Sequence, residues 1–285
     1  MTDVVLPSVV EVDGVPVRYA VTGDGVEGDL VLVHGSGLHA LSWHAVVPLL
    51  SERWRVVTLD LSGHGDSGHR AAYSGAGWAE EVLAVADAAG ASRPVLVGHS
   101  LGGRIALLAA ARHPGRVAGL VLLDCGIVLP ETLRGRPELL TRPPSGPPPR
   151  PPRVYPTRAA AVAAFRLGPP QPDPPASLLL PVAEYAIREV EGGWSWKHGG
   201  QRFPTLYGDD VITAATSVRV PISYISCGES LIVDDDKAAQ VAALIPGVRT
   251  ERVPGLHHHL ALEDPALTAR LIDDHARETL RSPRS

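Results

Sequence analysis

The sequence predicts an α/β fold whose core is a mostly parallel sheet of about eight strands with helices on both faces. Short apolar runs recur along the chain, as expected for strands that are buried on both faces. Segments with a helical pattern separate these runs, and such alternation is typical of parallel sheets. The chain has 285 residues and 45% hydrophobic content, which is enough for one large α/β core.

The predicted strands begin with a hairpin. Residues 9–23 alternate apolar and polar side chains around Asp13-Gly14, which predicts two antiparallel strands at one edge of the sheet. Apolar runs that predict the central strands lie at residues 29–35, 55–61, 93–99, 117–124, 220–227 and 248–254. The helical segments lie between or after them, at residues 76–90, 101–115, 234–247 and 265–280.

The alternation of strands and helices breaks between residues 126 and 218. Thirteen prolines fall between Pro143 and Pro175, a density that forbids a regular helix or a central strand. Because the flanking strands belong to one sheet, we predict an insertion over the ligand crevice at the carboxyl ends of the strands. The predicted core is therefore residues 1–125 and 219–285. Residues 126–218 form a proline-rich cap, with helices at 157–168 and 181–193.

Composition narrows the classes of partner. The net charge is −5 and no basic stripe is present, so no nucleic acid is expected. No run of about 18 apolar residues predicts a membrane span, and the first residues lack the pattern of a secretory signal. Cys125 and Cys227 each follow an apolar run and fit strand-end packing in a reduced protein. We expect a cytoplasmic protein, and the sequence leaves its oligomeric state open.

The segment LVGHSLGG (residues 96–103) predicts a nucleophilic serine. It contains a G-x-S-x-G pentapeptide between an apolar strand and an Ala/Leu-rich helix. A serine on such a sharp strand-to-helix turn projects its hydroxyl away from the sheet, and the helix N-terminus favours negative charge there. Ser100 is therefore the predicted nucleophile. The predicted oxyanion donors are the backbone N–H groups of Leu101 and Ser36, with Gly37 as the competitor of Ser36.

The chain resembles the α/β-hydrolase superfamily. The resemblance rests on HGSG (34–37), LDLSGHGDSG (59–68), GHSLGG, LVLLD (120–124) and HHLALEDP (258–265), which follow one another in family order. It implies a triad in the order serine, acid, histidine. In similar sequences the catalytic histidine precedes a proline by seven positions, which selects His258 from the triplet of residues 257–259. His64, in the GHGDS turn, is expected to be a packing residue.

The resemblance does not decide which of two strand ends carries the catalytic acid. Relatives usually carry an aspartate after the strand at 220–227, but the best alignment places Ser230 there. Some relatives with that departure take the acid from the earlier strand, where this chain has Asp124. We therefore predict Asp124, with Asp234 and Glu229 as alternatives, although Asp234 fits a helix cap better.

The resulting hypothesis is a serine hydrolase that cleaves an ester, thioester or lactone of a small apolar substrate through an acyl-enzyme. No cofactor is expected for this chemistry. No metal is expected either, because adjacent histidines on one loop cannot easily converge on one ion. The same motifs also fit carbon–carbon bond hydrolysis, peroxide-dependent perhydrolysis or non-hydrolytic cyclisation in natural-product assembly. A ligand-binding receptor with little turnover is the alternative from a different class.

Overall fold

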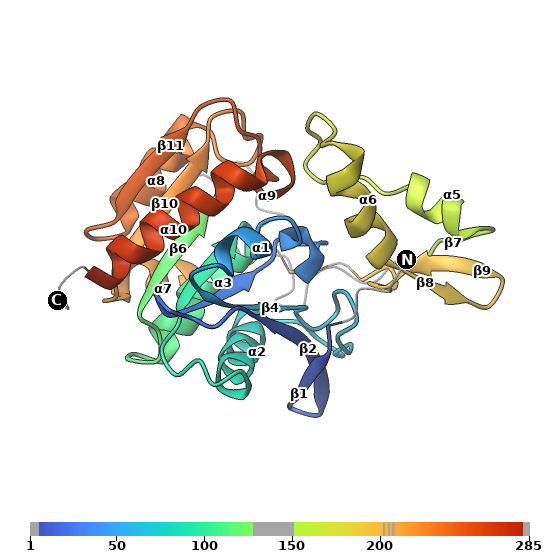
Figure 1. Ribbon diagram of the computed structural model, residues 1–285, viewed down its shortest axis with the longest axis horizontal. Helices are drawn as coiled ribbons and strands as arrows, with labels where there is room; N and C mark the ends of the chain where they lie inside the picture. The colour runs from blue at the N-terminus through green and yellow to red at the C-terminus, as the bar shows by residue number, and fades with distance from the viewer. Residues whose placement is uncertain (1–5, 128–150, 202, 205, 207–208, 282–285) are drawn as a thin grey trace.

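The computed structural model describes residues 6–127, 151–201, 203–204, 206 and 209–281, and its centre is an eight-stranded sheet (Figure 1). The strand order is β1-β2-β4-β3-β5-β6-β10-β11. Their bounds are Ser8–Val12 (β1), Val15–Thr22 (β2), Asp29–Val33 (β3), Arg55–Leu59 (β4), Val95–His99 (β5), Gly119–Leu123 (β6), Ile222–Cys227 (β10) and Arg249–Val253 (β11). Strand β2 pairs antiparallel with β1 and β4, and the other neighbours pair in parallel. The predicted fold class is confirmed.

The hairpin at the sheet edge follows from its turn residues. Asp13 and Gly14 connect β1 to β2 with φ angles of 50° and 73°. Two consecutive residues with positive φ make the tight turn whose twist matches that of paired strands. Val12 pairs with Val15 directly across this turn, so the hairpin has the two-residue loop that the sequence predicts.

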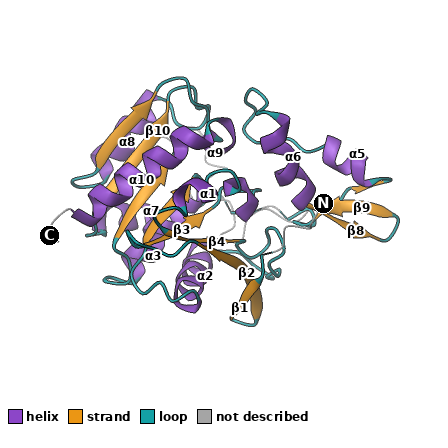
Figure 2. Ribbon diagram, viewed as in Figure 1, coloured by secondary structure: helices purple, strands orange, loops and turns teal. Residues whose placement is uncertain are grey.

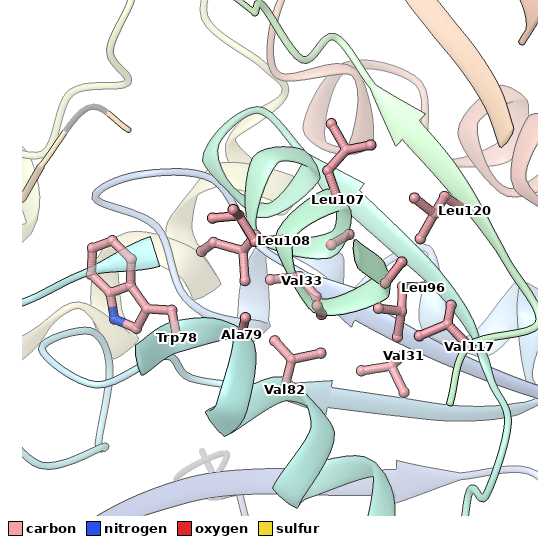
Figure 3. Close-up of a cluster of buried hydrophobic side chains, with 14 of the residues drawn as sticks. Val31, Val33, Trp78, Ala79, Val82, Leu96, Leu107, Leu108, Val117 and Leu120 are labelled. Carbon is pink, nitrogen blue, oxygen red and sulfur yellow. The ribbon is translucent and has the colours of Figure 1, made fainter. Parts of the chain in front are cut away.

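Alternation along the central strands supplies two separate apolar layers. In β3, Val31 and Val33 pack into one cluster, whereas Leu30 and Leu32 pack into the other. Successive side chains of a strand point to opposite faces, so one apolar run fills both layers. Figure 3 shows Val31 and Val33 beneath side chains of α2 and α3, which cover the first face.

Helices cover both layers. The face that contains Val31 packs against α2 (Gly75–Ala88), α3 (Leu101–Arg112), α7 (Asp209–Ser217) and α8 (Asp235–Leu244). The opposite face packs against α1 (Val47–Leu50) and α10 (Pro265–Arg281). The short helices η1 (Ala40–Trp43) and α9 (Leu260–Glu263) lie in the loops that approach the carboxyl ends of the strands.

The inserted region, residues 151–218 as described, builds a second small sheet. Its strands are β7 (Val154–Tyr155), β8 (Ile187–Val190) and β9 (Gly193–Trp196), in the order β7-β9-β8, with α5 (Arg158–Ala163) and α6 (Ala176–Tyr185) beside them. Figure 2 shows this group next to the main sheet rather than within it. Residues 143–150 of the proline-rich stretch lie outside the described residues.

The prediction of one helix over residues 181–193 is wrong. Helix α6 starts earlier and ends at Tyr185, and residues 187–190 pair with β9 instead. Gly192 and Gly193 adopt φ angles of 82° and 144° and reverse the chain, which favours a hairpin over a continued helix. A short stretch of mixed apolar and polar side chains fits either structure, so the glycine pair decides.

Four polar contacts are among those that dock the inserted region on the core. Two are side-chain pairs: Tyr185 Oη lies 2.7 Å from Asp60 Oδ2, and Lys197 Nζ lies 2.7 Å from Asp66 Oδ1. The ammonium group of Lys197 also lies 3.7 Å from the centroid of the Tyr185 ring. The other two are hydrogen bonds from core imidazoles to carbonyls of α6, which are His39 to Val182 and His44 to Leu178, each 3.0 Å long.

Candidate active site

Ser100 stands alone between strand β5 and helix α3, in a strained conformation. Its φ and ψ angles are 54° and −114°, a region that residues with a Cβ rarely occupy. The turn is tight enough to require glycine on both sides. A Cβ at Gly98 would lie 2.4 Å from the Gly102 carbonyl oxygen, and one at Gly102 would lie 2.2 Å from that of Val33. The predicted sharp turn is thus present, with the hydroxyl at the N-terminus of α3.

The structure brings Ser100, His258 and Asp124 together. His258 Nε2 lies 3.1 Å from Ser100 Oγ, and His258 Nδ1 lies 2.6 Å from Asp124 Oδ2. All three side chains are buried, with 8%, 3% and 0% exposure respectively. An imidazole that donates its Nδ1–H to a carboxylate keeps a lone pair on Nε2, which can accept the serine proton.

Asp124 follows strand β6 directly and has a positive φ of 43°. Its carboxylate accepts three hydrogen bonds: Oδ1 from the Cys227 amide at 2.9 Å, and Oδ2 from His258 Nδ1 and the Ser230 hydroxyl. A buried charge is tolerated when hydrogen bonds satisfy it, and these three also fix its orientation. Two of the three donors come from the end of the neighbouring strand β10 and from the turn after it.

The two alternative acids occupy other positions. Asp234 is the N-cap of α8, where its side chain accepts the amide hydrogen bond of Lys237 at 2.9 Å. Glu229 is exposed on the loop after β10. Helix capping accounts for Asp234, as the sequence suggests.

The neighbours of His258 in the triplet have separate partners. His257 is held by Glu263, which lies 2.8 Å from both its amide nitrogen and its Nδ1. His259 is buried, and its Nε2 lies 3.2 Å from the Gly168 carbonyl of the inserted region. Burial, and then the neighbouring His258, lower the pKa of His259 to about 3, so His259 is neutral at pH 7.

His99 is a functional candidate that the sequence reasoning missed. Its Nε2 donates to the main-chain carbonyl of His258 at 2.8 Å, and the two rings lie 4.7 Å apart. Burial holds the pKa of His99 well below its usual range, with His258 and His259 adding to the effect. The neutral ring of His99 thus fixes the backbone that carries the base. The only available signal was its place as the second residue of the pentapeptide.

The two predicted oxyanion donors belong to segments next to Ser100. Leu101 is the first residue of α3, where backbone N–H groups have no partner within the helix. Ser36 is exposed on the loop after β3, and a Cβ at the preceding Gly35 would lie 3.4 Å from Ser100 Cβ. His34 Nδ1 and the Leu38 amide both donate to the Gly35 carbonyl, at 2.8 and 3.2 Å, and fix this loop.

A cavity of about 350 Å³ lies between the Ser36 loop and the inserted region. Its lining includes Ser36 and His259, each a neighbour of the candidate site. The apolar part of the lining comes from both regions, namely Leu38, Phe165, Leu167 and Trp196. The inserted region therefore forms part of the wall of this cavity.

Several other predicted residues are packing residues. His64 is 2% exposed, and its ring is stacked on Phe203 at 3.8 Å. Cys125 and Cys227 are free thiols buried at strand ends.

Within the described part of the chain, histidine, cysteine and acidic side chains form no group suited to holding a metal ion. None of the helices described there has the length and apolarity needed to cross a bilayer.

Comparisons with known proteins agree with this architecture. A pimeloyl-[acyl-carrier protein] methyl ester esterase of Edwardsiella ictaluri is 46% identical over 93 residues, which is 33% of this chain and 34% of that protein. The match thus spans about a third of the length of this curated relative. The solved E-2-(acetamidomethylene)succinate hydrolase superposes with a TM-score of 0.78 at 22% identity, covering 94% of this chain and 97% of that one.

A thioesterase domain from the curacin biosynthetic pathway superposes with a TM-score of 0.74 at 22% identity, over 93% of this chain and 97% of that one. At such identities the two superpositions show the fold alone. The family model described as the alpha/beta hydrolase fold matches residues 30–265, which is most of the sequence. This chain belongs to the alpha/beta hydrolase fold family.

Proposed function

We propose that this chain is a serine hydrolase that cleaves an ester, thioester or lactone through an acyl-enzyme. The observation that carries the proposal is the position of His258, which bridges the Ser100 hydroxyl and the Asp124 carboxylate. A serine hydroxyl is a weak nucleophile at neutral pH, and an adjacent oriented base activates it. Neither a metal nor an organic cofactor is needed for this chemistry.

In the first half-reaction, Ser100 Oγ attacks the carbonyl carbon while His258 Nε2 takes the hydroxyl proton. The electron pair of the carbonyl moves onto its oxygen, where the amides of Leu101 and Ser36 donate to the developing oxyanion. Asp124 stabilises the imidazolium that forms and remains ionised itself. The oxyanion then collapses, and the leaving alkoxide or thiolate takes the proton from His258.

In the second half-reaction, water attacks the acyl-enzyme and His258 takes a proton from it. Collapse of the second tetrahedral intermediate releases the acid, and Ser100 recovers its proton from His258. The same base therefore serves both halves. The position of His99 supports this assignment, because its hydrogen bond fixes the main chain of His258 beside Ser100.

The inserted region is proposed to act as the cap, with residues 126–218 as cap and residues 1–125 and 219–285 as core. Its residues close one side of the 350 Å³ cavity next to Ser36. This volume is near the lower end of the range for ligand pockets, about 300–1,000 Å³. A small-molecule substrate with an apolar acyl or alcohol part fits that size and lining.

The curated relative supports an ester as the substrate class. Its name states hydrolysis of a methyl ester carried on pimeloyl-[acyl-carrier protein]. Because the match covers about a third of that relative, we carry over ester cleavage to this chain as a proposal and leave the particular substrate open.

A panel of p-nitrophenyl esters with acyl chains of increasing length tests the proposed function. We expect turnover of the shorter esters and its loss in Ser100→Ala. If the folded wild-type chain binds a ligand tightly but hydrolyses no ester of the panel, the receptor alternative replaces the hydrolase.

A further inference from the structure

The hydroxyl of Ser230 faces the acid rather than the solvent. Ser230 lies on the turn after β10, and its Oγ is 2.5 Å from Asp124 Oδ2. The same Oγ lies 3.1 Å from the amide nitrogens of Ile232 and Val233. The turn itself is closed by a hydrogen bond from the Ser230 amide to the Cys227 carbonyl. A side chain with three partners in different directions is held in one orientation.

Counting protons fixes the direction of each of these bonds. Backbone amides can only donate, so Ile232 and Val233 occupy the lone pairs of Ser230 Oγ. The remaining hydroxyl proton therefore points to Asp124 Oδ2. His258 Nδ1 donates to that same oxygen at 2.6 Å. The carboxylate is thus the acceptor of two donors on Oδ2 and of the Cys227 amide on Oδ1.

We propose that Ser230 is a positioning residue for the acid–base pair. The proposal rests on the proposed function, in which Asp124 orients His258. Ser230 acts through Asp124: its donated hydrogen bond stops the carboxylate from rotating away from the imidazole. Charge-assisted bonds of this kind are the strong ones, and a buried site strengthens them further.

The experiment compares Ser230→Ala, Ser230→Thr and Ser226→Ala on a short p-nitrophenyl ester. Ser226 is the matched control, because it is buried on β10 and its hydroxyl lies 3.4 Å from Arg252 Nη1 rather than at the acid. We expect Ser230→Ala to lower kcat by about 10- to 100-fold with KM within about twofold. Ser230→Thr, which keeps the hydroxyl, should retain most of the wild-type kcat. Unchanged kcat in Ser230→Ala overturns the positioning role.

A wild-type chain that hydrolyses no ester contradicts the proposed function rather than the positioning role, so the two failures are distinguishable.

Discussion

Asp124 reaches His258 from the end of strand β6, with 2.6 Å between its Oδ2 and the imidazole Nδ1. The adjacent strand β10 ends at Cys227, whose amide donates to the same carboxylate, and the turn after it contributes the Ser230 hydroxyl. The acid and its supports therefore come from two neighbouring strands. This arrangement yields predictions that separate Asp124 from its competitors.

Asp124→Asn should lower kcat by about 10³- to 10⁴-fold, because an amide fails to hold the imidazole in the tautomer that accepts the serine proton. Asp234→Asn is the matched control, since Asp234 caps α8 and pairs with Lys237 rather than with His258. It should leave kcat within about twofold, and asparagine also serves as a helix cap. Steady-state rates on one nitrophenyl ester measure both effects. A larger loss of kcat in Asp234→Asn than in Asp124→Asn would assign the acid role to Asp234.

Alanine at each position of the histidine triplet should give unequal losses. His258→Ala removes the base and should reduce kcat by at least about 10³-fold. His257→Ala should have a small effect, because His257 pairs with Glu263 rather than with the nucleophile. His259→Ala should act mainly on KM, since His259 lines the cavity and contacts Gly168. A dominant loss in His257→Ala would mean that the predicted register is off by one.

Tyr185→Phe should loosen the docking of the inserted region. The variant removes one hydrogen bond from the buried carboxylate of Asp60, whose pKa burial raises to about 6. The loss of a donor to such a group costs about 1–3 kcal/mol in the free energy of unfolding. Tyr155→Phe is the control, because Tyr155 Oη only accepts a 3.3 Å bond from Trp196 within the inserted region. Equal urea midpoints for both variants would contradict the docking role.

Acid should destabilise the protein through His39. Burial first, and then neighbouring charges such as His34, lower the pKa of His39 from 6.5 to about 3. Below pH 6.5 the unfolded chain binds a proton that the native imidazole refuses. The stability is therefore complete above pH 6.5 and is lost as the pH falls towards 3.

The corresponding variant is His39→Gln, which can still donate to the Val182 carbonyl but does not titrate. The free energy of unfolding of the wild type should fall relative to this variant, by at most about 1.4 kcal/mol per pH unit. Urea unfolding at pH 7, 6, 5 and 4 measures the difference. Parallel pH curves for the two proteins would show that His39 is not held neutral.

The core could be predicted because its signals are local. Each buried strand is an apolar run, and a hairpin turn such as Asp13-Gly14 is specified by adjacent residues. The strand in residues 187–190 was mistaken for helix because its pairing with β9 depends on a turn two residues later. The resemblance to a family gave the expected order of the motifs along the chain. The turn at Ser100 could also be predicted, because the pentapeptide stands between a strand and a helix.

The supports of the site could not be predicted because they are contacts between distant segments. The bond from His99 to the His258 carbonyl spans 159 positions, and that from Ser230 to Asp124 spans 106. No periodicity or spacing connects such pairs. The resemblance favoured Asp124 over Asp234 and Glu229, and the positions of the strands in space bring Asp124 to His258.

Labelling with a fluorophosphonate probe tests the central claim most directly. The probe bonds covalently to a serine only when a base activates it, so the adduct reports the Ser100–His258 pair without knowledge of the substrate. We predict one adduct on the peptide that contains Ser100 in the wild type, strongly reduced labelling in His258→Ala, and none in Ser100→Ala. Labelling that persists in a folded Ser100→Ala variant would contradict the account.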